Sequence, residues 1–232
     1  MLTMTNAPTW LLDYRRDVYS QTGEDGVIEK VLSLLPARDK CCVEFGAGDG
    51  VSLTNTRNLI ATQGYSAVLI EPHAKRYKAL AYNYSQLKQV LTVNKAVGWG
   101  AEDGLDAILS ETNIPQDFDL LSIDIDGNDW HVWRAVTAYK PKVVIIEFNP
   151  SIHTDVGFIQ DADPKVCQGA SLMALRDLGK EKGYELVSVL AWNAIFVDAQ
   201  YYALFGITDN SPHVLRANLQ CVTYMFIGYD GK

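Results

Sequence analysis

Four oxygen-bearing side chains follow two neighbouring apolar stretches of the sequence. Asp124 and Asp126 come after the first stretch, and Glu147 and Asn149 come after the next. Side chains two residues apart on an extended chain point the same way, and neighbouring strands lie only about 4.8 Å apart. We therefore expect these groups to meet, either as hard oxygen ligands for Mg²⁺ or another divalent cation or as groups that accept a proton.

A glycine-rich turn carries a second kind of chemistry. The apolar run 41–45 contains Glu44 and leads into Gly46, Gly48 and Gly50. Glycine lacks a Cβ, so the backbone can adopt left-handed conformations and let a ligand lie against its amides. The spacing G-x-G-x-G is one residue shorter than the G-x-G-x-x-G that binds a pyrophosphate. The turn therefore predicts a nucleotide-type site whose spacing differs from that of a dinucleotide-binding turn.

A further carboxylate closes the second apolar run. The stretch 67–70 ends at Glu71, where a carboxylate at the end of a second strand can accept the ribose hydroxyls of an adenosine. The alternative is that Glu71 caps the helix that follows Pro72.

The periodicity of apolar residues predicts the elements that position these groups. We expect strands over 41–45, 67–70, 90–93, about 118–123 and 142–146, and a hairpin of 184–190 and 193–198 joined at Ala191-Trp192. We expect helices over about 24–35, 52–60, 74–87, 102–110, 130–140 and 172–182. This alternation is typical of an α/β, Rossmann-like, mostly parallel doubly wound sheet with a C-terminal antiparallel hairpin.

Some connecting segments have expected roles. Thr22 and Asp25 have the spacing of a capping box for the first helix, and Ser20 or Gln21 would lie over the ligand. The long loop 151–168 is typical of a lid or a recognition segment. The apolar run 222–227 would be an added edge strand or part of a subunit contact.

Size and composition limit the classes of function. We expect one domain over residues 1–232, with an N-terminal helical cap (about 1–38), a core (39–198) and a C-terminal extension (199–232). The formal charge of −8 disfavours nucleic acid as a partner. The four cysteines lack metal-type spacing and indicate a reduced, cytoplasmic protein. We also expect neither a signal peptide nor membrane insertion.

The chain resembles the FkbM-type class I S-adenosylmethionine-dependent methyltransferases over about 18–198. The resemblance rests on six segments in order: Ser20-Gln21-x-Gly23-Glu24-Asp25, Val43 to Gly50, Asn55 to Leu59, Leu69 to Pro72, Ser122 to Asn128, and Asn193 to Val197. It implies an O-methyltransferase with S-adenosyl-L-methionine as its cofactor. The implied acceptor is a hydroxyl of a sugar, a sugar nucleotide, or a polysaccharide or natural-product precursor.

Together with the residue chemistry, the resemblance implies roles for particular side chains. The expected cofactor-binding residues are Gln21, Glu44, Gly46, Gly48, Asp49, Asn55, Glu71 and Asp124. The expected metal ligands are Asp126, Glu147 and Asn149, joined by Asp124. In a metal-free site, His153 or Asp126 would be the base, with Asp124 binding the cofactor's amino group or the substrate. The expected substrate contacts are Asn128 and Trp130, whereas Trp133 has the spacing of a core residue.

Other functions remain open at this stage. A nicotinamide-dependent oxidoreductase would use a similar sheet, and a non-catalytic protein could retain the cofactor pocket. Amine-directed methyltransferases carry Asn/Asp-Pro-Pro-aromatic after the fourth strand, where this chain has Asp124-Ile125-Asp126-Gly127, so base methylation is disfavoured. A small-molecule or glycan acceptor is the expected partner, and a homo-oligomer is left open.

Overall fold

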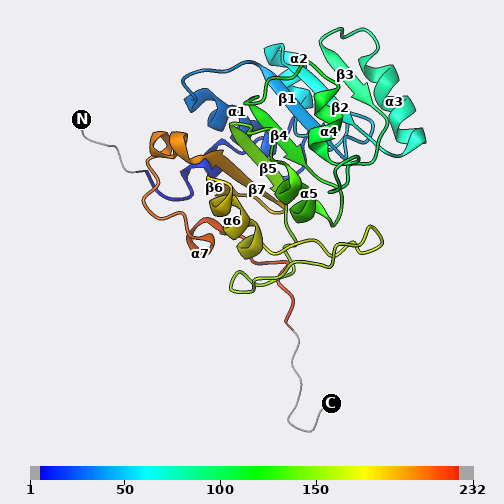
Figure 1. Ribbon diagram of the computed structural model, residues 1–232. Coiled ribbons are helices and arrows are strands. Elements are labelled where there is room, and N and C mark those ends of the chain that lie inside the picture. Colours follow the sequence, from blue (N-terminus) through cyan, green and yellow to red (C-terminus); the bar gives the residue numbers. More distant parts are fainter. Residues whose placement is uncertain (1–5, 225–232) are drawn as a thin grey trace.

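A single sheet with strand order β3-β2-β1-β4-β5-β7-β6 forms the centre of the computed structural model, which describes residues 6–224 (Figure 1). The strands are β1 (Cys41–Phe45), β2 (Ser66–Ile70), β3 (Val90–Val93), β4 (Leu120–Ile123), β5 (Val143–Glu147), β6 (Tyr184–Val189) and β7 (Asn193–Asp198). The first five run parallel, and β7 pairs antiparallel with both β5 and β6. The predicted doubly wound sheet with a C-terminal hairpin is confirmed.

Helices cover both faces of the sheet (Figure 1). One face carries α1 (Glu24–Leu34), α2 (Arg57–Gln63) and α3 (Ala74–Tyr84), with the 3₁₀ helices η1 (Trp10–Tyr14) and η2 (Ala199–Phe205). The other face carries α4 (Leu105–Ser110), α5 (Asp129–Ala135), α6 (Leu172–Glu181) and α7 (Pro212–Leu215). Along β1, Val43 and Phe45 enter one core and Cys42 enters the other. This alternation explains why the strands read as continuous apolar runs.

Two helices begin later than the sequence predicts, because side chains hold the preceding residues in loops. The helix expected over 52–60 starts at Arg57, since the buried Glu44 carboxylate accepts the Asn55 N–H at 2.9 Å. The helix expected over 102–110 starts at Leu105, since the Asp103 carboxylate accepts the Gly100 N–H at 2.8 Å. The helix expected over 74–87 ends at Tyr84.

The capping box predicted for α1 is wrong. The cap residue is Gly23, whose φ of 103° lies in the left-handed region, and no side chain caps the helix. Asp25 instead turns back and accepts the N–H groups of Val18, Tyr19 and Ser20 at 2.7 to 2.8 Å. This carboxylate folds the segment before α1 into a compact loop that carries Gln21.

The C-terminal extension packs on the core and adds no strand within residues 199–224. η2 buries Phe205, and α7 buries Leu215. The part of the predicted run 222–227 that is described, Val222–Tyr224, is not a strand, and Met225–Ile227 lie outside the described residues. In residues 6–224 no helix is long and apolar enough to cross a membrane.

Candidate active site

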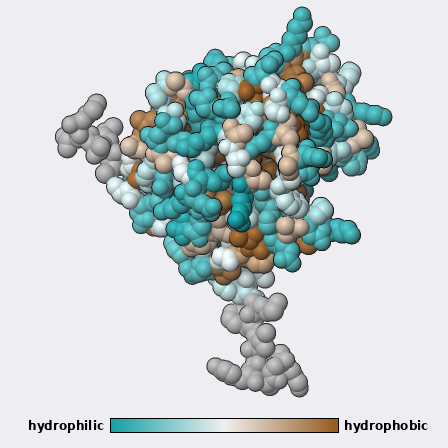
Figure 2. Space-filling view, viewed as in Figure 1, coloured by the Kyte–Doolittle hydropathy of each residue, from teal (hydrophilic) through white to brown (hydrophobic). Residues whose placement is uncertain are grey.

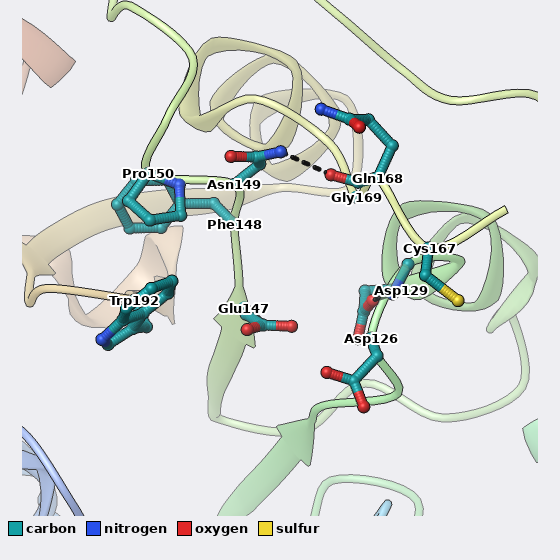
Figure 3. Close-up of a pocket in the computed structure, with 11 residues that line it drawn as sticks. Asp126, Asp129, Glu147, Phe148, Asn149, Pro150, Cys167, Gln168, Gly169 and Trp192 are labelled. Atoms are coloured by element: carbon teal, nitrogen blue, oxygen red, sulfur yellow. Dashed lines mark hydrogen bonds between the residues drawn. The ribbon is translucent and has the colours of Figure 1, made fainter. Parts of the chain in front are cut away.

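Two cavities lie side by side at the carboxyl ends of the parallel strands. The larger, of about 590 Å³, is lined by Gln21, Gly46, Gly48, Asp49, Ser52, Leu53, Glu71, Pro72, Arg76, Asp124, Ile125, Asp126 and Glu147. The smaller, of about 430 Å³, is lined by Asp126, Gly127, Asp129, Glu147, Phe148, Asn149, Pro150, Cys167, Gln168, Gly169 and Trp192 (Figure 3). Asp126 and Glu147 line both cavities and therefore form their boundary. The position, beside adjacent β1 and β4, is the topological switch point where ligands bind in open α/β sheets.

The glycine turn after β1 forms one wall of the larger cavity. Gly46 has a φ of 75°, and a Cβ there would lie 1.7 Å from the Asp124 carbonyl oxygen. Gly48 has a φ of 58° with no heavy atom within 4 Å of an added Cβ. Gly46 therefore lets the turn pack against the chain leaving β4. Gly48 instead borders the open space of the larger cavity.

Glu71 lies on the wall of the larger cavity with its carboxylate almost completely buried. One carboxylate oxygen accepts the Gly48 N–H at 2.9 Å, and the other accepts the His73 N–H at 2.7 Å. Each carboxylate oxygen can accept a second hydrogen bond. Glu71 therefore faces the cavity and holds the glycine turn, whereas no side-chain hydrogen bond caps α3, so the helix-capping alternative is wrong.

Gln21 and Asp49 also line the larger cavity, but Glu44 and Asn55 line neither cavity. The Glu44 carboxylate is 4% exposed and accepts hydrogen bonds from the hydroxyls of Thr54 and Thr56. The Asn55 amide donates to the Ser122 hydroxyl at 3.0 Å. Both residues, expected to contact a cofactor, instead brace the loop beneath the glycine turn. Burial raises the pKa of Glu44 despite these hydrogen bonds.

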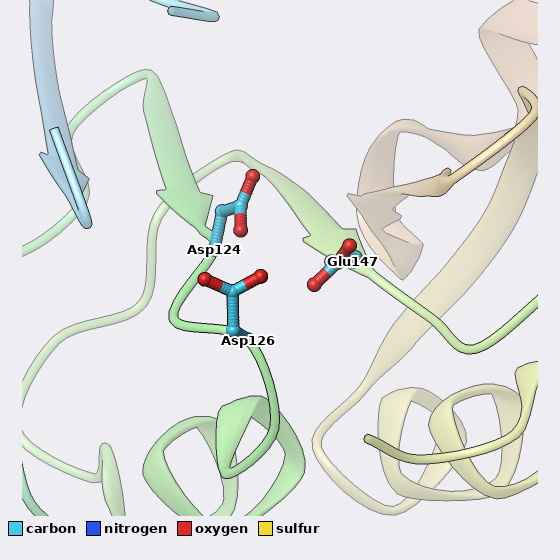
Figure 4. Close-up of side chains that lie close together, drawn as sticks. All are labelled: Asp124, Asp126 and Glu147. Atoms are coloured by element: carbon cyan, nitrogen blue, oxygen red, sulfur yellow. The ribbon is translucent and has the colours of Figure 1, made fainter. Parts of the chain in front are cut away.

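The boundary between the cavities holds an acid triad of Asp124, Asp126 and Glu147 (Figure 4). Each contributes an oxygen, and these oxygens all lie within 4.8 Å of one another. Asp129 shapes the loop after β4 by accepting the N–H groups of Ile125 and Gly127, both at 2.9 Å. The predicted meeting of the carboxylates of Asp124, Asp126 and Glu147 is therefore confirmed.

The acid triad is electrostatically crowded. Burial, followed by the charges of Asp129 and Asp126, raises the pKa of Asp124 to about 7. Burial, followed by the charges of Asp124, Asp129 and Asp126, raises the pKa of Glu147 to about 8. A divalent cation would relieve this repulsion, and carboxylate oxygens are the ligands that Mg²⁺ prefers.

Asn149, expected as a metal ligand, points away from the acid triad (Figure 3). Its side-chain oxygen accepts the Ser151 N–H at 2.8 Å and the Ser151 hydroxyl at 2.6 Å. Its side-chain nitrogen donates to the Gln168 carbonyl at 2.6 Å. The amide is thus used to hold the loop after β5, and the expectation is corrected.

The substrate contacts expected at Asn128 and Trp130, at the start of α5, are corrected too. Trp130 is 8% exposed, and its indole N–H donates to the Ala174 carbonyl at 3.3 Å, so its ring belongs to the core. Asn128 is buried and donates to the Asp163 carbonyl at 3.1 Å. Trp133 is a core residue, as predicted.

His153, the expected alternative base, lines neither cavity. Its Nδ1 lies 3.2 Å from the Asp155 carboxylate, which also lies 2.9 Å from His213 Nε2. His153 therefore belongs to the contact between the loop after β5 and the C-terminal segment, away from the acid triad.

The sequence alone did not identify Trp192 or Arg216. Trp192 is in the β6–β7 turn and lines the smaller cavity. The Arg216 guanidinium is buried and donates to the carbonyls of Pro150 and Ile152. The tight turn predicted at Trp192 was the only signal for that residue, and the sequence carries none for Arg216.

Comparisons with known proteins support the fold. No family model matches the chain, and no curated protein matches it, so membership of the FkbM family stays a prediction. The N-terminal domain of EvdMO1 with SAH bound aligns with a TM-score of 0.50 and 11% identity, over 77% of this chain and 82% of that one. The same domain in the presence of SAH and D-fucose gives 0.49 and 10%, over 82% and 94%. M. capricolum TrmK in complex with S-adenosyl-homocysteine gives 0.45 and 11%, over 74% and 67%. The first similarity confirms the Rossmann-like fold, which this chain shares with an SAH-bound domain.

Proposed function

We propose that this protein is an S-adenosylmethionine-dependent methyltransferase of the FkbM type that acts on a hydroxyl group. The observation that carries the proposal is the pair of adjoining cavities that meet at Asp126 and Glu147. Methyl transfer needs a donor and an acceptor held in line. The cavities have volumes of about 590 and 430 Å³, within the range of about 300 to 1,000 Å³ usual for ligand sites. The fold shared with the SAH-bound EvdMO1 domain supports the same conclusion.

The larger cavity is proposed to hold the cofactor, which supplies an electrophilic methyl group when bound. Glu71 faces the cavity with lone pairs to spare, so it would accept the ribose hydroxyls. The backbone at Gly46 and Gly48 would lie against the ligand, and Gln21 would cover it. Asp124 also lines this cavity, and its carboxylate would face the cationic amino group.

The acid triad is proposed to hold a divalent cation, such as Mg²⁺ or Mn²⁺. The donor set fits, because three hard oxygen ligands converge and their crowding leaves negative charge to be neutralised. An aliphatic hydroxyl must lose its proton near the transition state, and a bound cation would lower the pKa of that hydroxyl. The alternative is a metal-free site with Asp126 as the base, since His153 lies outside both cavities.

The activity test is methyl transfer from isotopically labelled S-adenosylmethionine to a panel of hydroxyl acceptors, in EDTA and with Mg²⁺ or Mn²⁺ restored. We expect activity to be lost in EDTA and recovered with the metal, and Asp126→Asn to abolish it. Asp161→Asn, on an exposed loop position, is the matched control. Full activity in EDTA would exclude the metal and leave Asp126 as the base. Cofactor binding without transfer to any acceptor would indicate a non-catalytic protein.

A further inference from the structure

The smaller cavity is acidic and contains no compensating cation. Its lining includes Asp126, Asp129 and Glu147, and no Lys, Arg or His among the residues that the structure describes. Arg216 packs behind the cavity wall, with its guanidinium 5.2 Å from the centre of the Phe148 ring. Its donors are directed to carbonyls of the loop after β5 rather than into the cavity. An anionic ligand would therefore be repelled here.

Adding the proposed cation does not reverse this conclusion. The three carboxylates of the acid triad carry −3 when ionised, so a divalent cation leaves a total of −1. The remaining ionisable carboxyl group of the lining, Asp129, offers no positive charge either. Sites that select phosphate or carboxylate groups use Arg, Lys, a metal ion or a helix N-terminus aimed at the ligand. Among residues 6–224 the lining of the smaller cavity has no cationic side chain, the N-terminus of α5 carries the acid Asp129, whose carboxylate already accepts the Gly127 N–H, and the charge of the cation is exceeded by that of its three ligands.

Trp192 gives the same cavity an aromatic wall. The residue is 39% exposed, unusually high for a tryptophan, and it lies beside Pro150 and Phe148 (Figure 3). Its carbonyl accepts the Phe148 N–H at 2.9 Å, which ties the turn to the end of β5. The indole N–H has no hydrogen-bond partner among the described residues. A fixed backbone, an exposed ring and a spare donor suit a ligand with an apolar face beside hydroxyl groups.

We propose that the smaller cavity binds an uncharged glycoside that stacks its apolar face on the Trp192 ring, with a hydroxyl directed toward Asp126 and Glu147. This inference rests on the proposed function and narrows it. Sugar nucleotides, sugar phosphates and uronic acids are excluded as acceptors. Trp192 is thus a specificity-determining residue.

Binding to the protein saturated with S-adenosylhomocysteine tests the inference without requiring turnover. The probes are methyl α-D-glucopyranoside, methyl α-D-mannopyranoside and methyl β-D-galactopyranoside, each paired with its 6-phosphate and its uronic acid. Saturation-transfer NMR would detect binding, and titration calorimetry would rank affinities. At least one neutral glycoside should bind, and its anionic counterparts should bind at least about tenfold more weakly, a factor equivalent to about 1.4 kcal/mol.

Substitutions at Trp192 separate stacking from other effects. Trp192→Ala should weaken the neutral glycoside about tenfold, in keeping with the loss of an aromatic stacking partner, and Trp192→Phe should retain most of the affinity. Tyr82→Ala, on a side chain that is 80% exposed and lines neither cavity, is the matched control. A thermal melt of each variant confirms that it is folded.

The outcomes distinguish this inference from the proposed function. Affinity for S-adenosylhomocysteine should be unchanged in Trp192→Ala, because Trp192 lines only the smaller cavity. Equal binding of neutral and anionic probes, no binding of any neutral probe, or an unaffected Trp192→Ala would overturn the inference. Failure of the wild-type protein to bind S-adenosylhomocysteine would instead overturn the proposed function.

Discussion

Three carboxylates crowd together at the boundary of the two cavities, and their protonation should govern how stability depends on pH. Burial raises the pKa of Asp124 to about 7 and that of Glu147 to about 8. In the unfolded chain both groups would titrate near pH 4. Between these limits the two groups bind more protons in the folded protein than in the unfolded one. Their contribution to the free energy of unfolding therefore falls as the pH rises from about 4 to about 8.

The first prediction is that Glu147→Gln flattens this pH dependence in metal-free protein. In EDTA at pH 8 the variant should be more stable than the wild type by roughly 1 to 3 kcal/mol, because the amide removes a buried charge from the acid triad. Urea denaturation at pH 5 and pH 8 measures the difference. Glu102→Gln, on an exposed residue, should change neither value. Parallel pH profiles for Glu147→Gln and the wild type would show that the triad is not crowded in solution.

The second prediction concerns the metal and is independent of activity. At pH 8, Mg²⁺ or Mn²⁺ should raise the melting temperature of the wild type, because a ligand that binds only the folded state stabilises it. Asp126→Asn should lose most of this response, and Asp161→Asn should keep it. An equal response in both variants would place the metal elsewhere or make it non-specific.

Among the elements, the contact between the glycine turn and the end of β4 is the tightest constraint on the site. A methyl group at Gly46 would lie 1.7 Å from the Asp124 carbonyl oxygen, whereas one at Gly64 would meet nothing within 4 Å. Both glycines have similar positive φ values, 75° and 69°. Comparing alanine substitutions at these two glycines thus separates the effect of steric overlap from the effect of backbone strain.

The third prediction is that Gly46→Ala is much more damaging than Gly64→Ala. Gly64→Ala should cost about 1 to 2 kcal/mol, the penalty of a left-handed non-glycine residue. Gly46→Ala should cost at least about 2 kcal/mol more, because β1 and β4 would have to separate. Urea unfolding of the two variants measures this difference. Equal losses would mean that the turn is not packed against β4 as the structure has it.

The C-terminal extension contributes to the site through one buried side chain. Arg216 donates to the carbonyls of Pro150 and Ile152 and to the Thr154 hydroxyl. The loop that it holds forms part of the smaller cavity. We therefore regard Arg216 as a positioning residue for the acceptor side of the site.

The fourth prediction is that Arg216→Ala lowers stability by about 2 to 4 kcal/mol, because the buried carbonyls lose their donors. It should also weaken binding of the neutral glycoside while leaving affinity for S-adenosylhomocysteine unchanged. Arg38→Ala, on an exposed residue, is the matched control. A loss of stability with unchanged glycoside affinity would reduce Arg216 to a purely structural role.

The strands were predictable from the sequence, and the beginnings of the helices were not. The bounds of β1, β2 and β5 agree with expectation within one residue, because buried parallel strands are uninterrupted apolar runs. The starts of α2 and α4 depend on hydrogen bonds that Glu44 and Asp103 make to the backbone. Such local side-chain bonds compete with helix formation and leave no periodic signal.

In the candidate site, too, some residues were predictable from the sequence and others were not. Asp124, Asp126 and Glu147 were predictable as a group, since Asp124 and Asp126 follow the end of β4, Glu147 ends β5, and the ends of these adjacent strands share one edge of the sheet. The roles of Trp130 and Trp192 were not, because whether an aromatic ring faces the core or a cavity depends on packing between distant segments. In the structure Trp130 is buried under α6, and Trp192 in the hairpin turn is exposed.

For the whole molecule, the order of the strands creates the site. Placing β4 beside β1 brings the glycine turn, Glu71 and the acid triad to one edge of the sheet, and the hairpin β6–β7 carries Trp192 to the far side of β5. The surface seen in Figure 2 is mainly hydrophilic, with apolar residues scattered over it. A formal charge of −8 further disfavours polyanionic partners.

Titration calorimetry with S-adenosylhomocysteine and NAD tests whether the larger cavity binds S-adenosylmethionine. We predict saturable one-to-one binding of S-adenosylhomocysteine and none of NAD. Glu71→Ala should weaken the former by about 1 to 3 kcal/mol, because the ribose hydroxyls lose their acceptor. Glu102→Ala should leave it unchanged. Binding of NAD without S-adenosylhomocysteine, or an unchanged affinity in Glu71→Ala, would contradict the claim.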